Sequence, residues 1–500
     1  MQFYEKLSFL LDLTSTSNRV LAQAIHVDPS LISRLRTGKR NLPQNQKYTK
    51  PMALYFARHC TTDYQHQALF EMLAVKQVSI LNTEHLSDII YYWLCGETDE
   101  VSRFMRTFGR LNLEETYTGI EKSDDHINTG NSVYYGNEGK RAAARAAYQH
   151  LQSLEKPGLI FIFTDENDTW ISQDYEFSCT LQKWGLDLIH RGFKFCHIAP
   201  PVTLINEAFE SLTRWMPLYM TGQTTVYFYP RLRDTVHRRT IVVMPQEIAL
   251  TSSSIYHQRS GNVTLLTTDR QLTQAYAEEF HDYLSLCRPM LESYTNPEKL
   301  TQCFTQFLSA DGIRIQQVPC LSAETTPAEI LNDCLLKRKE TEFPALSRLY
   351  MQEKEKLAQK KEDYSLIDIT CLSTAEEVRQ GKVPISFSYG LIAEPLYYTP
   401  ETYILHLQNI LKLMETCSNY HFVPLRSKSD ANGPLMVKEG QRAILVHLAP
   451  PLTAFEISQP DIVQLCREHL LQIADRIGYT GICRVKIMSQ IKELIRELQH

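Results

Sequence analysis

The chain has 500 residues, with 52 Lys and Arg against 57 Asp and Glu, and 43% of its residues are hydrophobic. This length predicts about three domains, and the apolar content excludes an intrinsically disordered chain. Because no apolar run approaches about 18 residues and the N-terminus lacks a secretory pattern, we expect no membrane span and no signal peptide. The 12 cysteines lack CxxC and zinc spacings, which favours a cytoplasmic, reducing environment.

Basic residues are unevenly distributed along the chain. Between Ser17 and Lys50, seven basic residues stand against one acidic residue, Asp28. The net charge of +6 in this segment leaves about −11 for the remainder of a chain whose total is −5. A basic segment in an otherwise acidic chain is typical of a protein that binds a polyanion, most often nucleic acid.

Local signals in the basic segment predict two short helices joined by a turn. Ser17 or Asn18 can cap the first helix, whose apolar residues have helical spacing up to Ile25. Asp28 is a good N-cap for the second helix, and Pro29 suits its first turn, where the missing N–H costs nothing. Gly38 then ends this helix, as C-cap glycines commonly do.

The segment LAQAIHVDPSLISRLRTGKR, residues 21–40, resembles the DNA-binding domains of the Cro/CI-like (XRE) regulator family. Ala22 supplies the small residue of the first helix, whereas His26 stands where the family usually has a glycine. Histidine tolerates the left-handed backbone conformation better than most residues do. The resemblance implies an all-α helix-turn-helix domain whose second helix enters the major groove of double-stranded DNA, and a homodimer on two half-sites.

The resemblance assigns DNA contacts to side chains that packing does not require. It implies base contacts by Pro29, Ser30, Ser33 and Arg34, of which Arg34 can bind a guanine through two hydrogen bonds. It implies phosphate contacts by Asn18, Arg36, Thr37, Lys39 and Arg40.

Residues 51 to 155 are predicted to be mainly helical, because apolar residues recur there at spacings of three and four. The run from Gly136 to Arg141 looks like a phosphate-binding loop. It fails the motif, however, because two residues rather than four separate its glycines and no Ser or Thr follows Lys140. An alanine-rich helix is expected instead.

From Lys156 onward the pattern changes to alternating strands and helices. A continuous apolar run over 158–163 predicts a buried strand, followed by an amphipathic helix and a strand over 193–198. This order is a βαβ unit and implies a parallel sheet. Further elements are expected as strands over 225–229, 240–244, 248–251 and 263–267 and a helix over 269–286.

The segment from His237 to Ser254 resembles the half-site motif of the phospholipase D-like superfamily, H-x-K, four residues, D, six residues, G-S-x-N. Arg239 stands in the Lys place, Met244 in the Asp place, and Ser252 and Ser254 within the G-S-x-N positions. The resemblance implies an anion-binding site formed by His237, Arg239, Ser252 and Ser254. Because methionine can neither orient nor stabilise a histidine nucleophile, we expect no enzyme, and we expect no metal and no cofactor.

A second set of α/β signals predicts a diverged internal duplication, the alternative being two unrelated α/β segments. Residues 399–425 parallel 174–200, residues 435–446 parallel 241–251, and residues 455–474 parallel 264–286. The second copy has no H-x-K motif. A pseudo-dimeric fold of this kind would place a small-molecule effector in a cleft between its two copies.

The predicted fold class is therefore multidomain, all-α and then α/β. The expected parts are a helix-turn-helix domain over 1–60, a helical connector over 61–155, a phospholipase D-like repeat over 156–296, a charged helical linker over 297–364, and a second α/β repeat with a C-terminal helix over 365–500. The amphipathic tail from Ile487 is either a capping helix or a dimer contact.

These patterns favour a sequence-specific transcriptional regulator whose C-terminal region senses a ligand or oligomerises. One alternative is a DNA-tethered phosphodiester hydrolase that uses His237. The other is an assembly platform that binds no small ligand.

Overall fold

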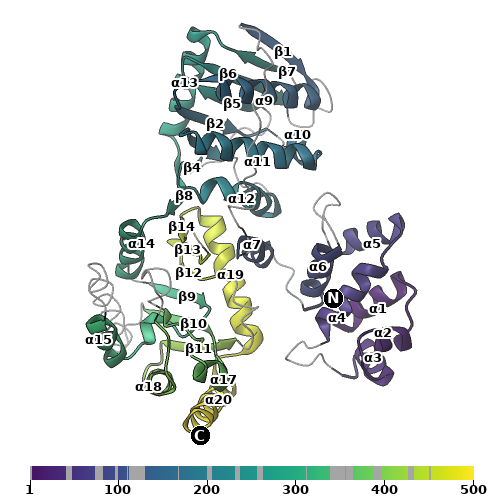
Figure 1. The fold of residues 1–500 in the computed structure, drawn as a ribbon, viewed down its shortest axis with the longest axis vertical. Coiled ribbons are helices and arrows are strands. Elements are labelled where there is room, and N and C mark those ends of the chain that lie inside the picture. Colours follow the sequence, from purple (N-terminus) through teal and green to yellow (C-terminus); the bar gives the residue numbers. More distant parts are fainter. Residues whose placement is uncertain are drawn as a thin grey trace. The chain divides into compact units, whose positions relative to one another are not determined.

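The chain forms two compact units, which are drawn in Figure 1. One comprises residues 1–103 with 168–179, and the other comprises residues 104–167 with 180–500. The computed structural model describes residues 3–40, 48–73, 83–95, 100–109, 111, 130–166, 168–199, 205–230, 237–255, 263–310, 312–337, 355, 364–386, 396–425, 433–449 and 452–500.

The described part of the first unit is helical, and most of its helices share one apolar core. Its helices are α1 (Phe3–Leu13), α2 (Asn18–Ala24), α3 (Pro29–Arg36), α4 (Thr49–His59), α5 (Asp63–Leu73), α6 (Thr83–Cys95) and α10 (Thr169–Ser172), and α7 (Glu100–Gly109) begins there. Leu10, Leu35, Phe56, Leu69 and Ile90 bring α1, α3, α4, α5 and α6 into this core, and each is fully buried. Because α5 and α6 share the core of α1–α4, the boundary expected at residue 61 separates no structural unit.

The two helices predicted in the basic segment are α2 and α3, and local capping sets their bounds. The Ser17 hydroxyl accepts a hydrogen bond from the Val20 N–H at 3.3 Å, and the Asp28 carboxylate accepts one from the Ser30 N–H at 2.7 Å. In the turn between them, His26 adopts a φ of +57°, the left-handed conformation that its position in the motif requires.

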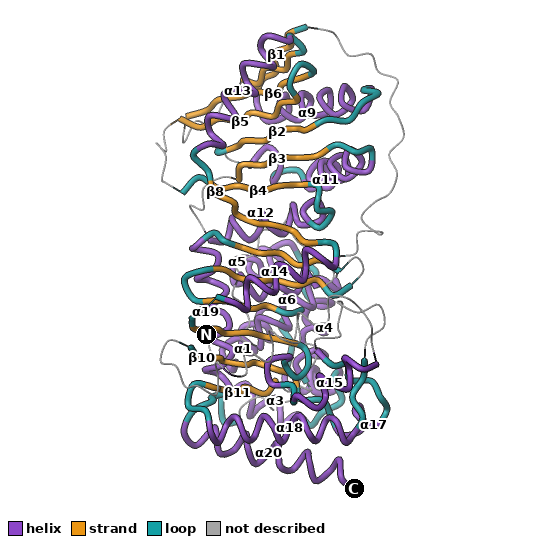
Figure 2. The backbone as a smooth tube through the Cα atoms, turned by 90° about the vertical axis from the view of Figure 1, so that its left-hand side faces the viewer, coloured by secondary structure: helices purple, strands orange, loops and turns teal. Residues whose placement is uncertain are grey.

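The second unit is built on a single mixed sheet, whose strands lie side by side in Figure 2. The strand order is β1-β7-β6-β5-β2-β3-β4-β8-β14-β13-β12-β9-β10-β11. The strands are β1 (Asn131–Tyr135), β2 (Leu159–Thr164), β3 (Lys194–Ala199), β4 (Thr224–Phe228), β5 (His237–Met244), β6 (Ile248–Ile255), β7 (Val263–Thr267), β8 (Arg288–Tyr294), β9 (Ile313–Val318), β10 (Ser365–Cys371), β11 (Tyr420–Leu425), β12 (Leu435–Lys438), β13 (Arg442–His447) and β14 (Thr453–Ile457).

Helices pack on both faces of this sheet, and others lie beside those helices. The bounds of all these helices follow. They are α9 (Gly136–Ser153), α11 (Tyr175–His190), which begins in the first unit, α12 (Ile205–Tyr219), α13 (Arg270–Ser285), α14 (Pro297–Ser309), α15 (Ala328–Lys337), α17 (Ala375–Arg379), α18 (Pro400–Thr416), α19 (Pro460–Ile477) and α20 (Gly481–Gln499), with a short 3-10 helix η2 (Ala323–Thr325). α20 packs its buried isoleucines against α18 and α17, so the amphipathic tail covers the chain's own core.

The sheet contains the same six-strand arrangement twice. The order β7-β6-β5-β2-β3-β4 recurs as β14-β13-β12-β9-β10-β11, with parallel and antiparallel pairings in the same places. β8 pairs with β4 of the first repeat and with β14 of the second. The repeats therefore join edge to edge through β8, and a ligand cleft between the two copies stays a prediction.

Two further expectations about the repeat need correction. The segment 297–364 is not a helical linker, because β9 lies within it and pairs with β10 and β12 in the second repeat. Residues 399–425, which form α18 and β11, correspond to α12 and β4 rather than to residues 174–200. β4 and β11 are each the last strand of the parallel part of their repeat, so they occupy equivalent positions.

Side chains alternate between two faces of the sheet, which are named here by their covering helices. On the α13 face, Ile241 and Val243 of β5 pack with Phe280 of α13. On the α9 face, Thr240 of β5 and Ser252 of β6 accept hydrogen bonds from Lys140 of α9. Residues 237, 239, 241 and 243 therefore share the α13 face, and residues 238, 240, 242 and 244 share the α9 face.

Candidate functional site

Helix α3 presents one polar face to solvent. Leu31, Ile32 and Leu35 are buried against the core of the first unit. With about 100° of rotation per residue, the remaining exposed side chains fall on one face about 140° wide. These exposed residues are Pro29, Ser30, Ser33, Arg34 and Thr37, and Lys39 and Arg40 follow, also exposed.

Arg34 lies along this face, where its guanidinium makes two hydrogen bonds to Ser30. Its Nε donates to the Ser30 carbonyl oxygen and its Nη2 donates to the Ser30 hydroxyl, both at 3.1 Å. These bonds lie along the exposed surface of α3, where an approaching acceptor can replace them. Thr37 donates from its hydroxyl to the Ser33 carbonyl at 2.9 Å and closes the helix.

Arg36 differs from the other predicted contacts because its guanidinium is held by α1. Nη2 pairs with the Asp12 carboxylate at 2.6 Å, and Nε donates to the Ser8 hydroxyl at 3.3 Å. The helical rotation from Arg34 to Arg36 turns this side chain toward α1. Arg36 therefore contributes to the packing of α3 against α1 in this structure, and its contact with a phosphate stays a prediction.

Asn18, the first residue of α2, is half-buried, and its Oδ1 atom is buried without a hydrogen-bond partner. Contact of Asn18 with a phosphate stays a prediction. The same holds for base contacts by the exposed residues of α3.

The four residues of the phospholipase D-like motif do not form one site. In the β5–β6 hairpin, Thr240 lies opposite Ser252 and Arg238 lies opposite Ser254. Residues paired across a ladder share a face, so Ser252 and Ser254 are on the α9 face, whereas His237 and Arg239 are on the α13 face. The expected anion site of these four residues is wrong, because a turn of three residues fixes a register that divides them between faces.

Arg239 already has partners on its own face. Its guanidinium pairs with the Glu279 carboxylate of α13 at 2.7 Å and lies 5.8 Å from the centre of the Tyr276 ring. Met244 stands at the opposite end of β5 from His237. Met244 lies seven positions after His237, and seven steps along a strand span about 23 Å. The identity of residue 244 therefore has no bearing on the chemistry of His237.

A buried group that sequence reasoning missed lies on the α9 face. We call it the lysine–glutamate cluster: Lys140, Glu166, Thr240 and Ser252. Lys140 Nζ lies 2.6 Å from Glu166 Oε2, 3.0 Å from the Thr240 hydroxyl and 2.9 Å from the Ser252 hydroxyl. The Thr240 hydroxyl donates to the same Glu166 oxygen at 2.6 Å. The Ser252 hydroxyl also donates to this oxygen. Both charged side chains are 2% exposed, so this cluster holds an ion pair inside the protein.

Burial and charge oppose each other in this cluster. Burial raises the pKa of Glu166, but the Lys140 charge and the hydrogen bonds outweigh it, so the pKa falls below its ordinary value. Burial lowers the pKa of the Lys140 ammonium, and the Glu166 carboxylate only partly offsets this effect. The signal in the sequence was periodicity, since Lys140 lies on the same helical face as the buried Ala143, Ala147 and Leu151.

The second repeat has its own buried polar network, around Asp368 of β10. The Asp368 carboxylate accepts hydrogen bonds from Gln316 at 2.9 Å, Ser322 at 2.5 Å and Tyr420 at 3.2 Å. Glu324 pairs with Arg314 of β9 beside it. Burial raises the pKa of Asp368 to about 6, although its three donors favour the charged form. These groups hold β9, β10 and β11 together within the core.

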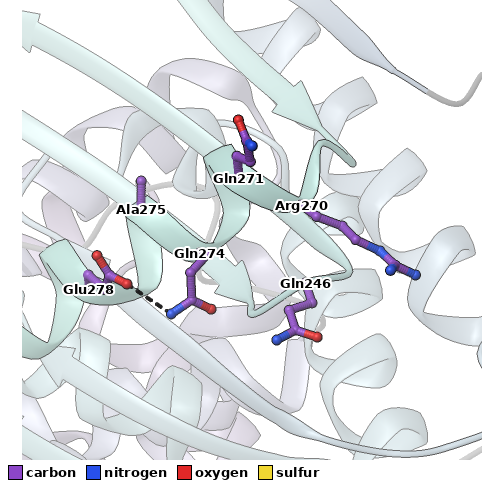
Figure 3. Close-up of a pocket in the computed structure, with 6 residues that line it drawn as sticks. All are labelled: Gln246, Arg270, Gln271, Gln274, Ala275 and Glu278. Carbon is purple, nitrogen blue, oxygen red and sulfur yellow. Dashed lines mark hydrogen bonds between the residues drawn. The ribbon is translucent and has the colours of Figure 1, made fainter.

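The surface around α13 carries an open depression of about 500 Å³. Figure 3 shows its lining residues, which are Gln246, Arg270, Gln271, Gln274, Ala275 and Glu278. Gln274 donates to Glu278 at 3.0 Å, and the N-cap Asp269 already accepts hydrogen bonds from two N–H groups of the first turn of α13. The lining includes none of the predicted ligand residues.

Two searches of the described residues bear on the expected partners. No described helix is long and apolar enough to cross a membrane. Among these same residues, no three His, Cys, Asp or Glu side chains gather as metal ligands would.

Comparisons with known proteins give little to add to this geometry. No family model and no curated protein matches the chain. Similar solved structures include NucT from Helicobacter pylori, 13% identical with a TM-score of 0.24, over 32% of this chain and 98% of that one. Another is TrmBL2, described as an archaeal chromatin protein with a novel mode of DNA binding, 12% identical with a TM-score of 0.23, over 45% of this chain and 81% of that one. TM-scores this low carry no argument about fold or function, and membership of the Cro/CI-like family stays a prediction.

Proposed function

We propose that this protein is a sequence-specific DNA-binding regulator of transcription, and that α2 and α3 form a helix-turn-helix that contacts double-stranded DNA. The exposed face of α3 carries the proposal: Arg34 lies there beside Ser30 and Ser33, and Lys39 and Arg40 follow. Such a face supplies donors for base edges and cations for phosphates. The N-terminal residues of a recognition helix meet the bases in the major groove.

Each exposed residue has a distinct role in this proposal. Arg34 binds a guanine edge through two hydrogen bonds, after its guanidinium releases Ser30. Lys39 and Arg40, beyond the end of α3, bind phosphates and fix the position of the helix without selecting sequence. Asn18 contacts a phosphate from the start of α2. We leave Arg36 out of the interface because Asp12 holds its guanidinium.

The α/β unit serves oligomerisation, in this proposal, rather than catalysis. The motif residues His237 and Arg239 lie on one face of the sheet and Ser252 and Ser254 on the other, and Arg239 pairs with Glu279. The sequence also predicted a ligand site formed by these four residues, and their division between the two faces leaves that prediction without a site. The hydrolase alternative needs a phosphate-binding side chain on the same face of the sheet as His237. Arg239 lies on that face, but its guanidinium already pairs with Glu279.

Selection from a random-sequence duplex library, followed by fluorescence anisotropy with the selected duplex, tests DNA binding. Arg34→Ala should lose about 1–3 kcal/mol of discrimination at one base pair. Lys39→Ala should weaken binding to selected and scrambled duplexes equally and lower the salt slope by about one. The matched controls Arg496→Ala and Lys486→Ala change exposed residues of α20 and should bind like the parent protein. Equal affinity of all five proteins would refute the proposal, as would a library that yields no selected sequence.

A separate assay distinguishes the hydrolase alternative. The full chain is incubated with bis(4-nitrophenyl) phosphate, and release of nitrophenolate is compared with that of His237→Ala. We expect no difference between the two proteins. Turnover that disappears in His237→Ala would establish a hydrolase and remove our assignment for the α/β unit.

A further inference from the structure

The two edge strands of the sheet, β11 and β1, differ in how they are protected from pairing with another strand. At the β11 end, Arg484 of α20 donates to the Tyr420 carbonyl oxygen of β11 at 3.1 Å, and Pro424 lies within the strand. A covering helix and a proline are both devices that prevent an edge strand from pairing further. β1, at the other end, has the sequence Asn-Ser-Val-Tyr-Tyr, without a charge or a proline, and its neighbour in the described part of the chain is β7.

The hydrogen-bonding groups of β1 can be assigned to two sides. The Thr268 N–H donates to the Gly130 carbonyl at 3.3 Å, so this pair is a hydrogen-bonded one. Hydrogen-bonded and non-hydrogen-bonded pairs alternate along an antiparallel ladder. Ser132 and Tyr134 therefore bond β7, and Asn131 and Val133 direct their backbone N–H and C=O groups away from the sheet.

An apolar row accompanies this open edge. Val133 is 50% exposed, Tyr135 71%, Val263 of β7 45% and Ile255 of β6 50%. The register places Tyr135 beside Val263, and alternation along the strands puts all four side chains on the α13 face. Exposed aliphatic and aromatic groups gathered at a bare sheet edge are typical of a protein interface.

We propose that β1 pairs with β1 of a second copy of this chain, antiparallel about a two-fold axis at Val133. Val133 would exchange both backbone hydrogen bonds with its twin, and Tyr135 would lie beside the twin's Asn131. The strand brings no charge toward its own copy, so self-pairing meets no repulsion. Edge-to-edge pairing also extends a device the chain already uses, since β8 joins the two repeats in this way. The proposal does not depend on DNA binding.

Sedimentation velocity of the full chain at micromolar concentrations tests the pairing. We expect a species of about twice the 57.8 kDa chain mass. Val133→Lys places two like charges side by side and should weaken the dimer about tenfold or more. Val485→Lys, the same change at an exposed position of α20, should leave the dimer intact. A monomeric parent protein, or a Val133→Lys dimer as tight as the parent's, would overturn the proposal.

A cysteine at position 133 tests the register independently of stability. Antiparallel hydrogen-bonded pairs hold their Cα atoms about 5.5 Å apart, within the range that a disulfide spans. Mild oxidation should therefore convert Val133→Cys, but not Val485→Cys, into a covalent dimer. If the parent protein is a dimer and Val133→Cys does not cross-link, another surface pairs the copies or another partner occupies β1, and the proposal fails.

Discussion

Removal of the Lys140 ammonium gives a prediction whose size follows from the lysine–glutamate cluster. Lys140→Met leaves the Glu166 carboxylate buried, with Thr240 and Ser252 as its donors. An uncompensated buried charge costs about 3–5 kcal/mol. Glu166 can escape this cost by taking up a proton. From its ordinary pKa of 4.5, protonation at pH 7 costs about 3.4 kcal/mol, which caps the penalty.

Because protonation of Glu166 limits the penalty, the stability lost in Lys140→Met should depend on pH. Each pH unit changes the protonation cost by about 1.4 kcal/mol, so the penalty should fall from about 3 kcal/mol at pH 7 to below about 1 kcal/mol at pH 5. The direction of this pH dependence follows from the pKa of Glu166 in each protein. In the parent protein the pKa of Glu166 is lowered, so its stabilisation is present above pH 4.5 and is lost below it. In Lys140→Met we expect burial to raise that pKa, because the Lys140 charge no longer opposes it, so stability should fall as pH rises.

Hydrogen–deuterium exchange of peptides from β5 and β6 is the suitable assay, because a chain of two compact units has no single free energy of unfolding. Lys492→Met is the matched control, since that side chain is 52% exposed and its ion pair with Glu415 should contribute less than about 1 kcal/mol. Lys140→Met with Glu166→Gln should abolish the pH dependence. A Lys140→Met penalty below about 1 kcal/mol at pH 7, or one that persists at pH 5, would refute the reasoning.

Three further predictions concern the second repeat and the first unit. Burial raises the pKa of Asp368 from 3.8 to about 6, so the stability it contributes is present below pH 4 and lost as pH rises through 6. Hydrogen–deuterium exchange of peptides from β10 should therefore show Asp368→Asn gaining about 2 kcal/mol of stability on the parent between pH 4 and pH 7, and a difference that does not change with pH would contradict this. Gly38→Ala should lower stability by about 1–2 kcal/mol, because Gly38 has a φ of +69° and a Cβ would lie 3.2 Å from the Tyr4 ring. Faster hydrogen–deuterium exchange in α1 and α3 would show this loss. Gly109→Ala is the control and should lower stability little, because the space around Gly109 is open. Arg36→Ala should weaken DNA binding less than Lys39→Ala in the anisotropy assay and cost at most about 1 kcal/mol of stability, since the Asp12 pair is partly exposed; a larger loss of affinity would return Arg36 to the interface.

The sequence predicted best where local interactions decide the structure. The bounds of α2 and α3 follow from Ser17, Asp28 and Pro29, whose capping interactions involve neighbours in the chain. Strand β7 also lies where its apolar run predicts, at Val263–Thr267.

Long-range partners account for what the sequence did not show. β9 carries Arg314 and Gln316, whose polar side chains interrupt the apolar run that marks a buried strand. They are buried because Glu324 and Asp368 pair with them, and Asp368 is distant in the chain. The divided motif of β5 and β6 has a similar cause, since spacing along the chain does not reveal on which face a residue will lie.

The measurement closest to the central claim is methylation interference at guanine N7, an atom that faces the major groove. Duplex from the library selection is partly methylated, separated into bound and free fractions by the full chain, and mapped. We predict that methylation of one guanine in each half-site prevents binding by the parent protein and has no effect on binding by Arg34→Ala. An identical interference pattern for both proteins would contradict the placement of α3 in the major groove.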